Sequence, residues 1–170
     1  IDLKSEVSFG AAINAAKRDF ASAESSPTQF SKDAYEGFIA GRTLIASTAG
    51  ELDQEALKEL QSHRDQIVGA WESAYAATMV HYINETLEHM GAIGTPEYDF
   101  AAHATAWSEL KGFALCFQFN PRSAVSESDY SKLHALLGDA PIHAGHEASE
   151  QTAYRATLLE ARALLGNAFG

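Results

Sequence analysis

Apolar residues recur along most of this chain at intervals of three and four positions, which is the spacing of one face of an α-helix. Breaks rich in Gly, Pro, Ser and Asn separate these periodic segments. No segment alternates apolar and polar residues as a half-buried β-strand does. The pattern predicts six helices, over about Leu3–Ala23, Ser31–Gly50, Asp53–Met90, Pro96–Phe119, Glu127–Leu137 and Glu147–Leu165.

Residues with strong preferences at helix ends support these boundaries. Ser31, Asp53 and Ser126 stand where N-caps are needed, because their side-chain oxygens accept hydrogen bonds from the first free backbone N–H groups. Pro96 suits the first turn of the fourth helix. Gly138 suits the end of the fifth.

Long helices joined by short loops favour an antiparallel bundle. The chain has 170 residues, a length that suits one domain, and 46% of them are hydrophobic, as in chains with a packed core. We therefore expect an all-α antiparallel helical bundle, with residues 1–170 as a single domain.

Charge narrows the choice of partners. The formal net charge is −11, with 12 Lys and Arg against 23 Asp and Glu. A nucleic-acid partner is excluded on this ground, because binding to phosphate needs a basic surface. No uninterrupted apolar run is long enough for a transmembrane helix. A metal ion or cationic ligand is compatible with the acidic charge, although solubility is the more ordinary explanation.

Several motifs that carry chemistry are missing from the sequence. It contains no Gly-rich phosphate-binding loop, no Gly-x-Ser-x-Gly turn, no Cys-x-x-Cys and no His-Glu-x-x-His. Nucleotide hydrolysis, serine hydrolysis and structural zinc are therefore not expected.

The first candidate site is the pair His81 and Glu85 on the third helix. Residues four apart share a helix face, so both side chains could reach one metal ion. Trp71 lies near the same stripe. The ordinary alternative is a core histidine that is hydrogen-bonded to a buried polar group.

The second candidate centres on His103 and Trp107, one turn apart on the fourth helix, with Glu109 and Lys111 close by. Glu109 falls on a different face from His103, so one metal ion cannot easily take both from this helix alone. The alternative is packing, with a buried ion pair that holds neighbouring helices in register.

The third candidate is a loop and helix start that combines His143 and His146 with Glu147 and Glu150. Imidazoles and carboxylates together can bind a transition metal. The alternative is incidental surface binding, and the two glutamates also suit the positive end of a helix dipole.

Two strings carry a resemblance to a known family: Trp-Ser-Glu-Leu-Lys-Gly-Phe-Ala at 107–114 and Gln-Phe-Asn-Pro-Arg-Ser at 118–123. The chain resembles an uncharacterised family of bacterial cell-envelope lipoproteins related to the imelysin-like proteins. The segments at 34–41, 71–72, 81–84 and 136–141 are also similar, so the resemblance spans about Ala34 to the C-terminus.

The resemblance implies an all-helical protein in the periplasm, anchored at the outer membrane or secreted. Imelysin-like proteins typically contain two bundles, so this chain looks like the C-terminal half, with its N-terminal half or another subunit as partner. Relatives are linked to iron or haem uptake, and some were classed as metallopeptidases. The imelysin signature Gly-x-His-x-x-Glu is absent, because the segment from His81 ends in Asn84. The closer family places His and Gly where this chain has Ala106 and Cys116.

We interpret the chain as a binding protein, more so than an enzyme, with a role in metal, iron or haem uptake and a divalent metal or iron as the candidate cofactor. A metal-dependent hydrolase of imelysin type and a purely structural half of a two-bundle protein are the alternatives. The candidate ligand-binding residues are Trp71, Tyr82, Trp107 and Lys111. The candidate metal ligands are His81, Glu85, His103 and Glu109.

Overall fold

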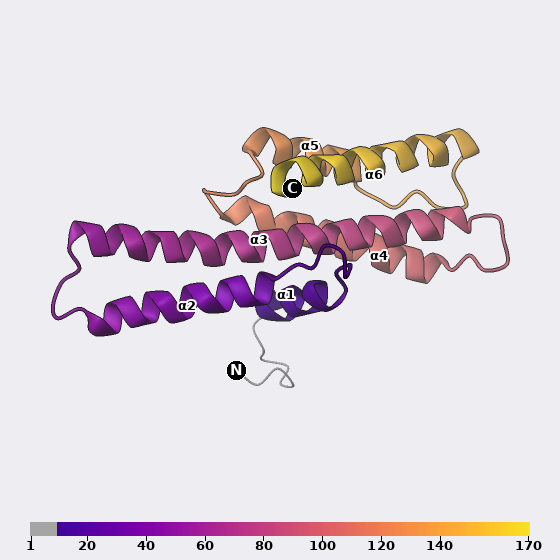
Figure 1. Ribbon diagram of the computed structural model, residues 1–170. Helices are drawn as coiled ribbons and strands as arrows, with labels where there is room; N and C mark the ends of the chain where they lie inside the picture. Colours follow the sequence, from indigo (N-terminus) through magenta and orange to yellow (C-terminus); the bar gives the residue numbers. More distant parts are fainter. Residues whose placement is uncertain (1–9) are drawn as a thin grey trace. The chain divides into compact units, whose positions relative to one another are not determined.

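The computed structural model describes residues 10–170, so the expected helical residues 3–9 lie outside the described residues. The described chain is an all-α helical bundle, as predicted (Figure 1). Its elements are α1 (Gly10–Phe20), α2 (Phe30–Ser47), α3 (Gln54–Gly91), α4 (Phe100–Ala114), the 3₁₀ helix η1 (Leu115–Phe119), α5 (Glu127–Leu137) and α6 (Ala148–Phe169).

The chain divides into two compact units, and the division falls inside the long helix α3. Unit 1 extends to Tyr75, and unit 2 runs from Ala76 to Gly170. The sequence pattern predicts a single domain, and it gives no sign of this division because the helical periodicity continues through it.

In unit 1, α2 and the N-terminal part of α3 form an antiparallel helical hairpin (Figure 1). Two glycines of α2 face α3. A Cβ added to Gly37 would lie 2.7 Å from Cγ1 of Ile67, and one added to Gly41 would lie 3.3 Å from Cδ1 of Leu60. The small residues therefore set the close approach of the two helices.

The N-terminus of α2 is capped by a side chain from α1. The carboxylate of Asp19 accepts hydrogen bonds from the backbone N–H groups of Phe30 and Ser31, both at 2.8 Å, and from the hydroxyl of Thr28 at 2.9 Å. The expectation that Ser31 caps this helix is wrong: α2 begins at Phe30, and Gln29 at the N-cap position makes no capping bond. Burial raises the pKa of Asp19, but hydrogen bonds from Ser31, Thr28 and Phe30 outweigh it, so the pKa is lowered overall.

Three other helix ends are formed by the residues that the sequence predicts for them. Asp53 Oδ1 accepts from the N–H groups of Glu55 at 3.0 Å and Ala56 at 2.8 Å, which confirms it as the cap of α3. Ser126 caps α5 through the N–H of Asp129. Gly138 ends α5 with a φ of 70°, a conformation that favours glycine.

The fourth helix differs at both ends from the prediction. It begins at Phe100, and not at Pro96, because Asp99 caps it by accepting from the N–H groups of Ala101 and Ala102. Its α-helical part ends at Ala114, and the remaining turns to Phe119 are 3₁₀. The last helix starts next to the expected residue, with Glu147 at its N-cap and a capping box of Glu147 and Glu150, but it continues to Phe169.

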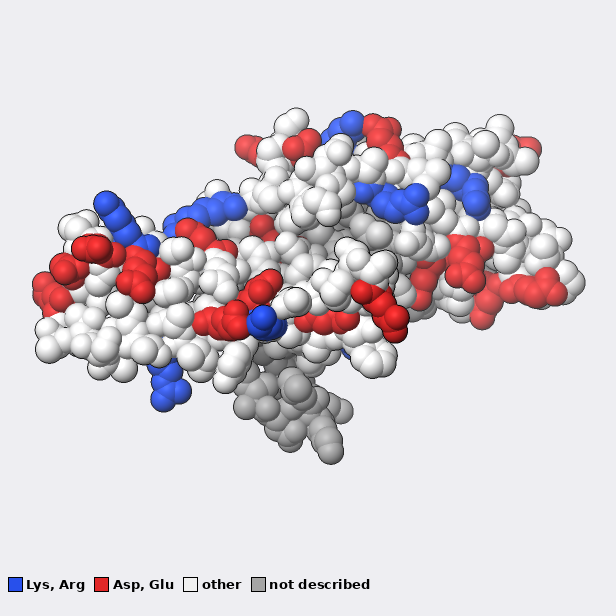
Figure 2. All heavy atoms as spheres, in the orientation of Figure 1, with Lys and Arg blue, Asp and Glu red and all other residues white. Residues whose placement is uncertain are grey.

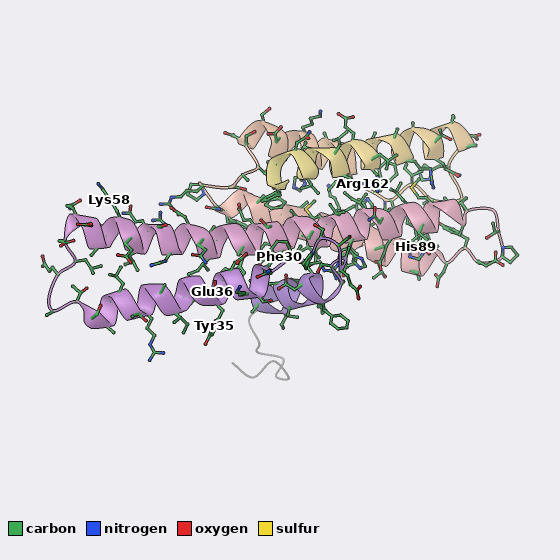
Figure 3. All side chains as sticks on the ribbon, in the orientation of Figure 1. Phe30, Tyr35, Glu36, Lys58, His89 and Arg162 are labelled. Atoms are coloured by element: carbon green, nitrogen blue, oxygen red, sulfur yellow. The ribbon has the colours of Figure 1, made fainter. Side chains whose placement is uncertain are left out.

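Unit 2 has a core of fully buried aliphatic side chains contributed by four helices. α4 and α6 both pack against α5. Arg162 of α6 donates to Oδ1 of Asn84 on α3 at 2.8 Å (Figure 3). The fully buried aliphatic residues are Met79, Ile83, Leu110, Leu133, Leu137 and Leu158, with Leu165 almost fully buried.

The surface carries charges of both signs. On the face drawn in Figure 2, Lys and Arg side chains lie among Asp and Glu side chains. Within residues 10–170, no helix is long and apolar enough to cross a membrane.

Asp19→Asn tests the capping contact between α1 and α2. We expect it to lower the free energy of unfolding by about 1 kcal/mol at neutral pH, the usual cost of losing a capping carboxylate. Since folding lowers the pKa of Asp19, its contribution is present above the unfolded pKa and is lost as the pH falls through the folded one. Urea unfolding from neutral to acidic pH measures the difference, which should shrink in acid. Exposed Glu24→Gln is the control, and an equal loss there would contradict the capping role.

Candidate binding sites

The side chain of Trp107, a predicted ligand-binding residue, is bonded within unit 2. Its Nε1–H is shared between the hydroxyl of Tyr154 at 2.8 Å and the carbonyl of Leu137 at 3.2 Å. Tyr154 in turn donates to the same carbonyl at 2.7 Å. Lys111 Nζ donates to the carbonyl of Gly138 at 2.6 Å. Together these bonds hold α4 and α6 to the C-terminal end of α5.

These contacts satisfy carbonyls that a helix leaves free at its C-terminal end. Burial raises the pKa of Tyr154 to about 12, against an opposing effect of the hydrogen bond from Trp107, so the phenol stays protonated and able to donate. The polar atoms of Trp107 and Lys111 are thus engaged in fixing the fold, in agreement with the packing alternative for this segment.

His81 and Glu85 form the pair that their spacing predicts. Nε2 of His81 lies 3.1 Å from Oε1 of Glu85, and each side chain is 40% exposed. The ring of Tyr82 lies beside that of His81, with centroids 5.1 Å apart, and stacks on Phe113 with centroids 5.9 Å apart. The pair is therefore accessible, with an aromatic pair next to it.

The other two candidate metal ligands lie in different surroundings. His103 is fully buried, and its Nδ1 is hydrogen-bonded to the hydroxyl of Tyr98 at 3.2 Å. Glu109 is exposed on α4. Among the residues that the structure describes, no group of three or more His, Cys, Asp or Glu side chains is arranged to hold a metal ion.

The histidines of the loop before α6 contact each other and the backbone. The rings of His143 and His146 meet edge to face, with centroids 4.5 Å apart. Nδ1 of His143 accepts from the N–H of Gly145 at 3.0 Å, and Nδ1 of His146 accepts from the N–H of His143 at 3.2 Å. Glu147 and Glu150 form the capping box of α6. These groups therefore already have local roles.

Unit 1 contains a groove that the sequence did not predict. It lies between α2 and the first part of α3, with a volume of about 690 Å³, in the range of small-molecule and cofactor sites. Beside it, Phe38 contacts the ring of Trp71 with centroids 5.4 Å apart, so one predicted ligand-binding residue supports its wall. The lining residues are Gly37, Phe38, Gly41, Arg42, Ile45, Ala46, Leu57, Leu60, Gln61, His63, Arg64 and Ile67.

The polar residues that line the groove are Arg42, Arg64, His63 and Gln61. Arg42 is exposed, whereas Arg64 makes two hydrogen bonds to the carboxylate of Asp65, at 2.8 and 3.0 Å. The side chain of His63 is 21% exposed, and its Nε2 lies 3.7 Å from Oε1 of Glu59. None of the residues that line the groove is acidic, although the whole chain carries a net charge of −11.

Sequence reasoning missed the groove because periodicity does not tell which apolar residues stay uncovered. Phe38 and Ile45 are seven residues apart, the spacing of one apolar helix face, yet they are 50% and 55% exposed. The available signal was the pair Gly37 and Gly41, which brings α2 close to α3 and leaves the larger side chains along the edge of the contact.

Comparison of the sequence with protein-family models and with curated proteins, and of the structure with solved structures, gave no match.

Trp107→Phe tests whether this side chain acts in folding. We expect the free energy of unfolding to fall by about 1 kcal/mol, because the half-buried indole N–H and its two hydrogen bonds are lost. Urea unfolding measures this loss, with exposed Ser108→Ala on the same helix as control. Unchanged stability would show that the bonds to Tyr154 and Leu137 do not hold unit 2 together.

Proposed function

We propose that this chain is a binding protein of the bacterial cell envelope that carries haem in the α2–α3 groove as part of iron uptake. The observation that carries the proposal is the meeting of an apolar surface, one histidine and two arginines in one groove. The resemblance to envelope lipoproteins related to imelysin-like proteins supports the location and the link to iron.

The apolar part of the groove suits the haem macrocycle, which is planar and largely apolar. Phe38, Leu60 and Ile67 supply aromatic and aliphatic surface. Burying such surface stabilises a complex by roughly 25 cal/mol for each Å² removed from water. Phe38 and Ile45 are 50% and 55% exposed, so apolar surface is available for a ligand to cover.

His63 is the residue that would bind the iron. Imidazole is a common axial ligand of haem iron. His63 lies on α3 opposite Gly41 of α2, since a Cβ added to Gly41 would lie 3.7 Å from Cβ of His63. Its Nε2 is near Glu59 at 3.7 Å, longer than a hydrogen bond, so binding iron does not break a strong contact.

Arg42 suits a propionate of haem. Guanidinium groups bind carboxylates with two parallel hydrogen bonds. Arg64 already holds Asp65 in this way through Nε and Nη2, so exposed Arg42 is the arginine left to bind a propionate. In an acidic protein, Arg42 in a groove with no acid among its lining residues favours an anionic ligand.

Titration of the purified protein with hemin, followed by its Soret absorption, tests the proposal. We expect one hemin per chain with the spectrum of a histidine-bound iron, loss of that spectrum in His63→Ala, and at least about tenfold weaker binding in Arg42→Glu, because a repulsion replaces an attraction. His81→Ala, which removes an exposed histidine of unit 2, should bind as the unchanged chain does. Circular dichroism confirms the fold of each variant.

A spectrum that is the same in His63→Ala and in the unchanged protein would overturn haem binding at this groove. That result would favour the alternative that this chain is a structural half of a two-bundle protein. Tyr35 projects from α2 away from α3 (Figure 3), and the apolar surface of α2 extends over Phe38 and Ile39. In that case the groove packs against the N-terminal half or another subunit. Light scattering that shows a dimer, made monomeric by Ile45→Asp, would support this reading.

The His81–Glu85 pair supports a second candidate role, binding of a divalent metal. An accessible imidazole and carboxylate 3.1 Å apart supply two ligands, and catalysis by a metal-dependent hydrolase would require a third. We expect weak binding of Zn²⁺ in calorimetry that is lost in His81→Ala and kept in His63→Ala. Near-stoichiometric metal in protein purified without chelator, measured by elemental mass spectrometry and lost in His81→Ala, would favour this role over haem carriage.

A further inference from the structure

Three elements of unit 2 bring histidines together at one end of α3. His89 is on the last turn of α3 (Figure 3), His103 is on α4, and His143 with His146 is in the loop before α6. The ring centroids of His89 and His103 are 6.1 Å apart, and those of His143 and His146 are 4.5 Å apart. Phe100 of α4 contacts His143, with centroids 5.2 Å apart, and so ties the loop to α4.

His103 is the buried member of this group. Its side chain has no exposure, Nδ1 is bonded to Tyr98, and Nε2 has no hydrogen-bond partner. A buried nitrogen without a partner cannot hold a proton and its charge without a large cost. Burial lowers the pKa of His103, and the charges of His89 and His143 lower it further.

The charge interactions that act on His103 come from His89 and His143, and both disfavour a positive charge there. The carboxylate of Asp99 accepts from two backbone N–H groups at the start of α4. From α6, the guanidinium of Arg155 donates to the carbonyl of Leu87 at 3.0 Å, so it adds positive charge beside the last turn of α3. Glu88, the neighbour of His89, is exposed.

We propose that this histidine cluster is an acid-sensitive latch, which opens the end of unit 2 formed by the last turn of α3, the start of α4 and the loop at 139–147. At neutral pH the uncharged rings pack together. When protons bind, His103 gains a buried charge, and His89 and His143 repel it. The loop and the last helical turn separate so that water reaches the ring. This property is independent of ligand binding in unit 1.

The direction of the pH dependence follows from the lowered pKa of His103. The unfolded or opened chain binds a proton with the ordinary value near 6.5, whereas the closed form binds it only at lower pH. Between these two values the open form holds more protons, so stability of the closed form falls as the pH falls below about 6.5. Above that value both forms are neutral, and the pH has no effect through this group.

Hydrogen exchange measured by mass spectrometry tests the latch, at pH values of about 7.5 and 5.5, with labelling times scaled for the intrinsic rate. We expect at least about tenfold lower protection in acid for peptides covering 85–91, 98–106 and 139–147, and no change for 30–47 of unit 1. His103→Phe keeps an aromatic ring but cannot be protonated, so it should remove this response. Exposed His81→Gln should leave it intact.

Equal protection at both pH values in the unchanged protein, or a full response in His103→Phe, would overturn the proposal. If His103→Phe does not fold, the double variant His89→Gln with His143→Gln serves instead, because it removes the repelling charges and leaves His103 in place. It should shift the midpoint of opening to lower pH. An unchanged midpoint would likewise reject the latch.

Discussion

The packing of unit 2 depends on the side-chain hydrogen bonds that the free backbone carbonyls at the C-terminal end of α5 accept. A helix leaves its last carbonyls without partners, and in a packed environment each such group costs roughly 1–3 kcal/mol. Here the indole of Trp107, the phenol of Tyr154 and the ammonium of Lys111 supply the missing donors. Because these side chains come from α4 and α6, the same bonds that complete α5 also fix the positions of the two helices that pack on it. The hydrogen bonds that satisfy the free carbonyls of α5 therefore also determine where α4 and α6 lie on it.

That constraint explains which parts of the fold the sequence could predict. Apolar periodicity predicted six helices, and the local caps Asp53 and Ser126 were identified because a cap acts within three residues of its own position. Asp19 was missed because it caps a helix eleven residues further on, which only the tertiary structure brings near. Trp107 was noticed for its residue type, but its partners lie thirty and more residues away.

The candidate sites also differ in whether local helix geometry or tertiary packing brings their residues together. The position of His81 and Glu85 on one helix face follows from helix geometry alone, and their 3.1 Å contact agrees with it. A site that also includes His103 requires two helices to be placed against each other, and no periodicity supplies that information. The groove of unit 1 is a harder case, since its apolar residues look like core residues in the sequence. Only the structure shows that Ile45 is more than half exposed.

Three histidines of this chain illustrate how surroundings decide the chemistry of one residue type. His81 is accessible, and its Nε2 lies 3.1 Å from a carboxylate oxygen of Glu85, so the two groups face solvent together. His63 lines an apolar groove together with two arginines, and its side chain is 21% exposed, so it is the histidine that we propose for haem iron. His103 is enclosed, with neighbours that lower its pKa, so a proton there acts against the packing around it. The proposed haem and acid responses thus rest on burial and neighbouring charge, which the spacing of histidines along the sequence does not encode.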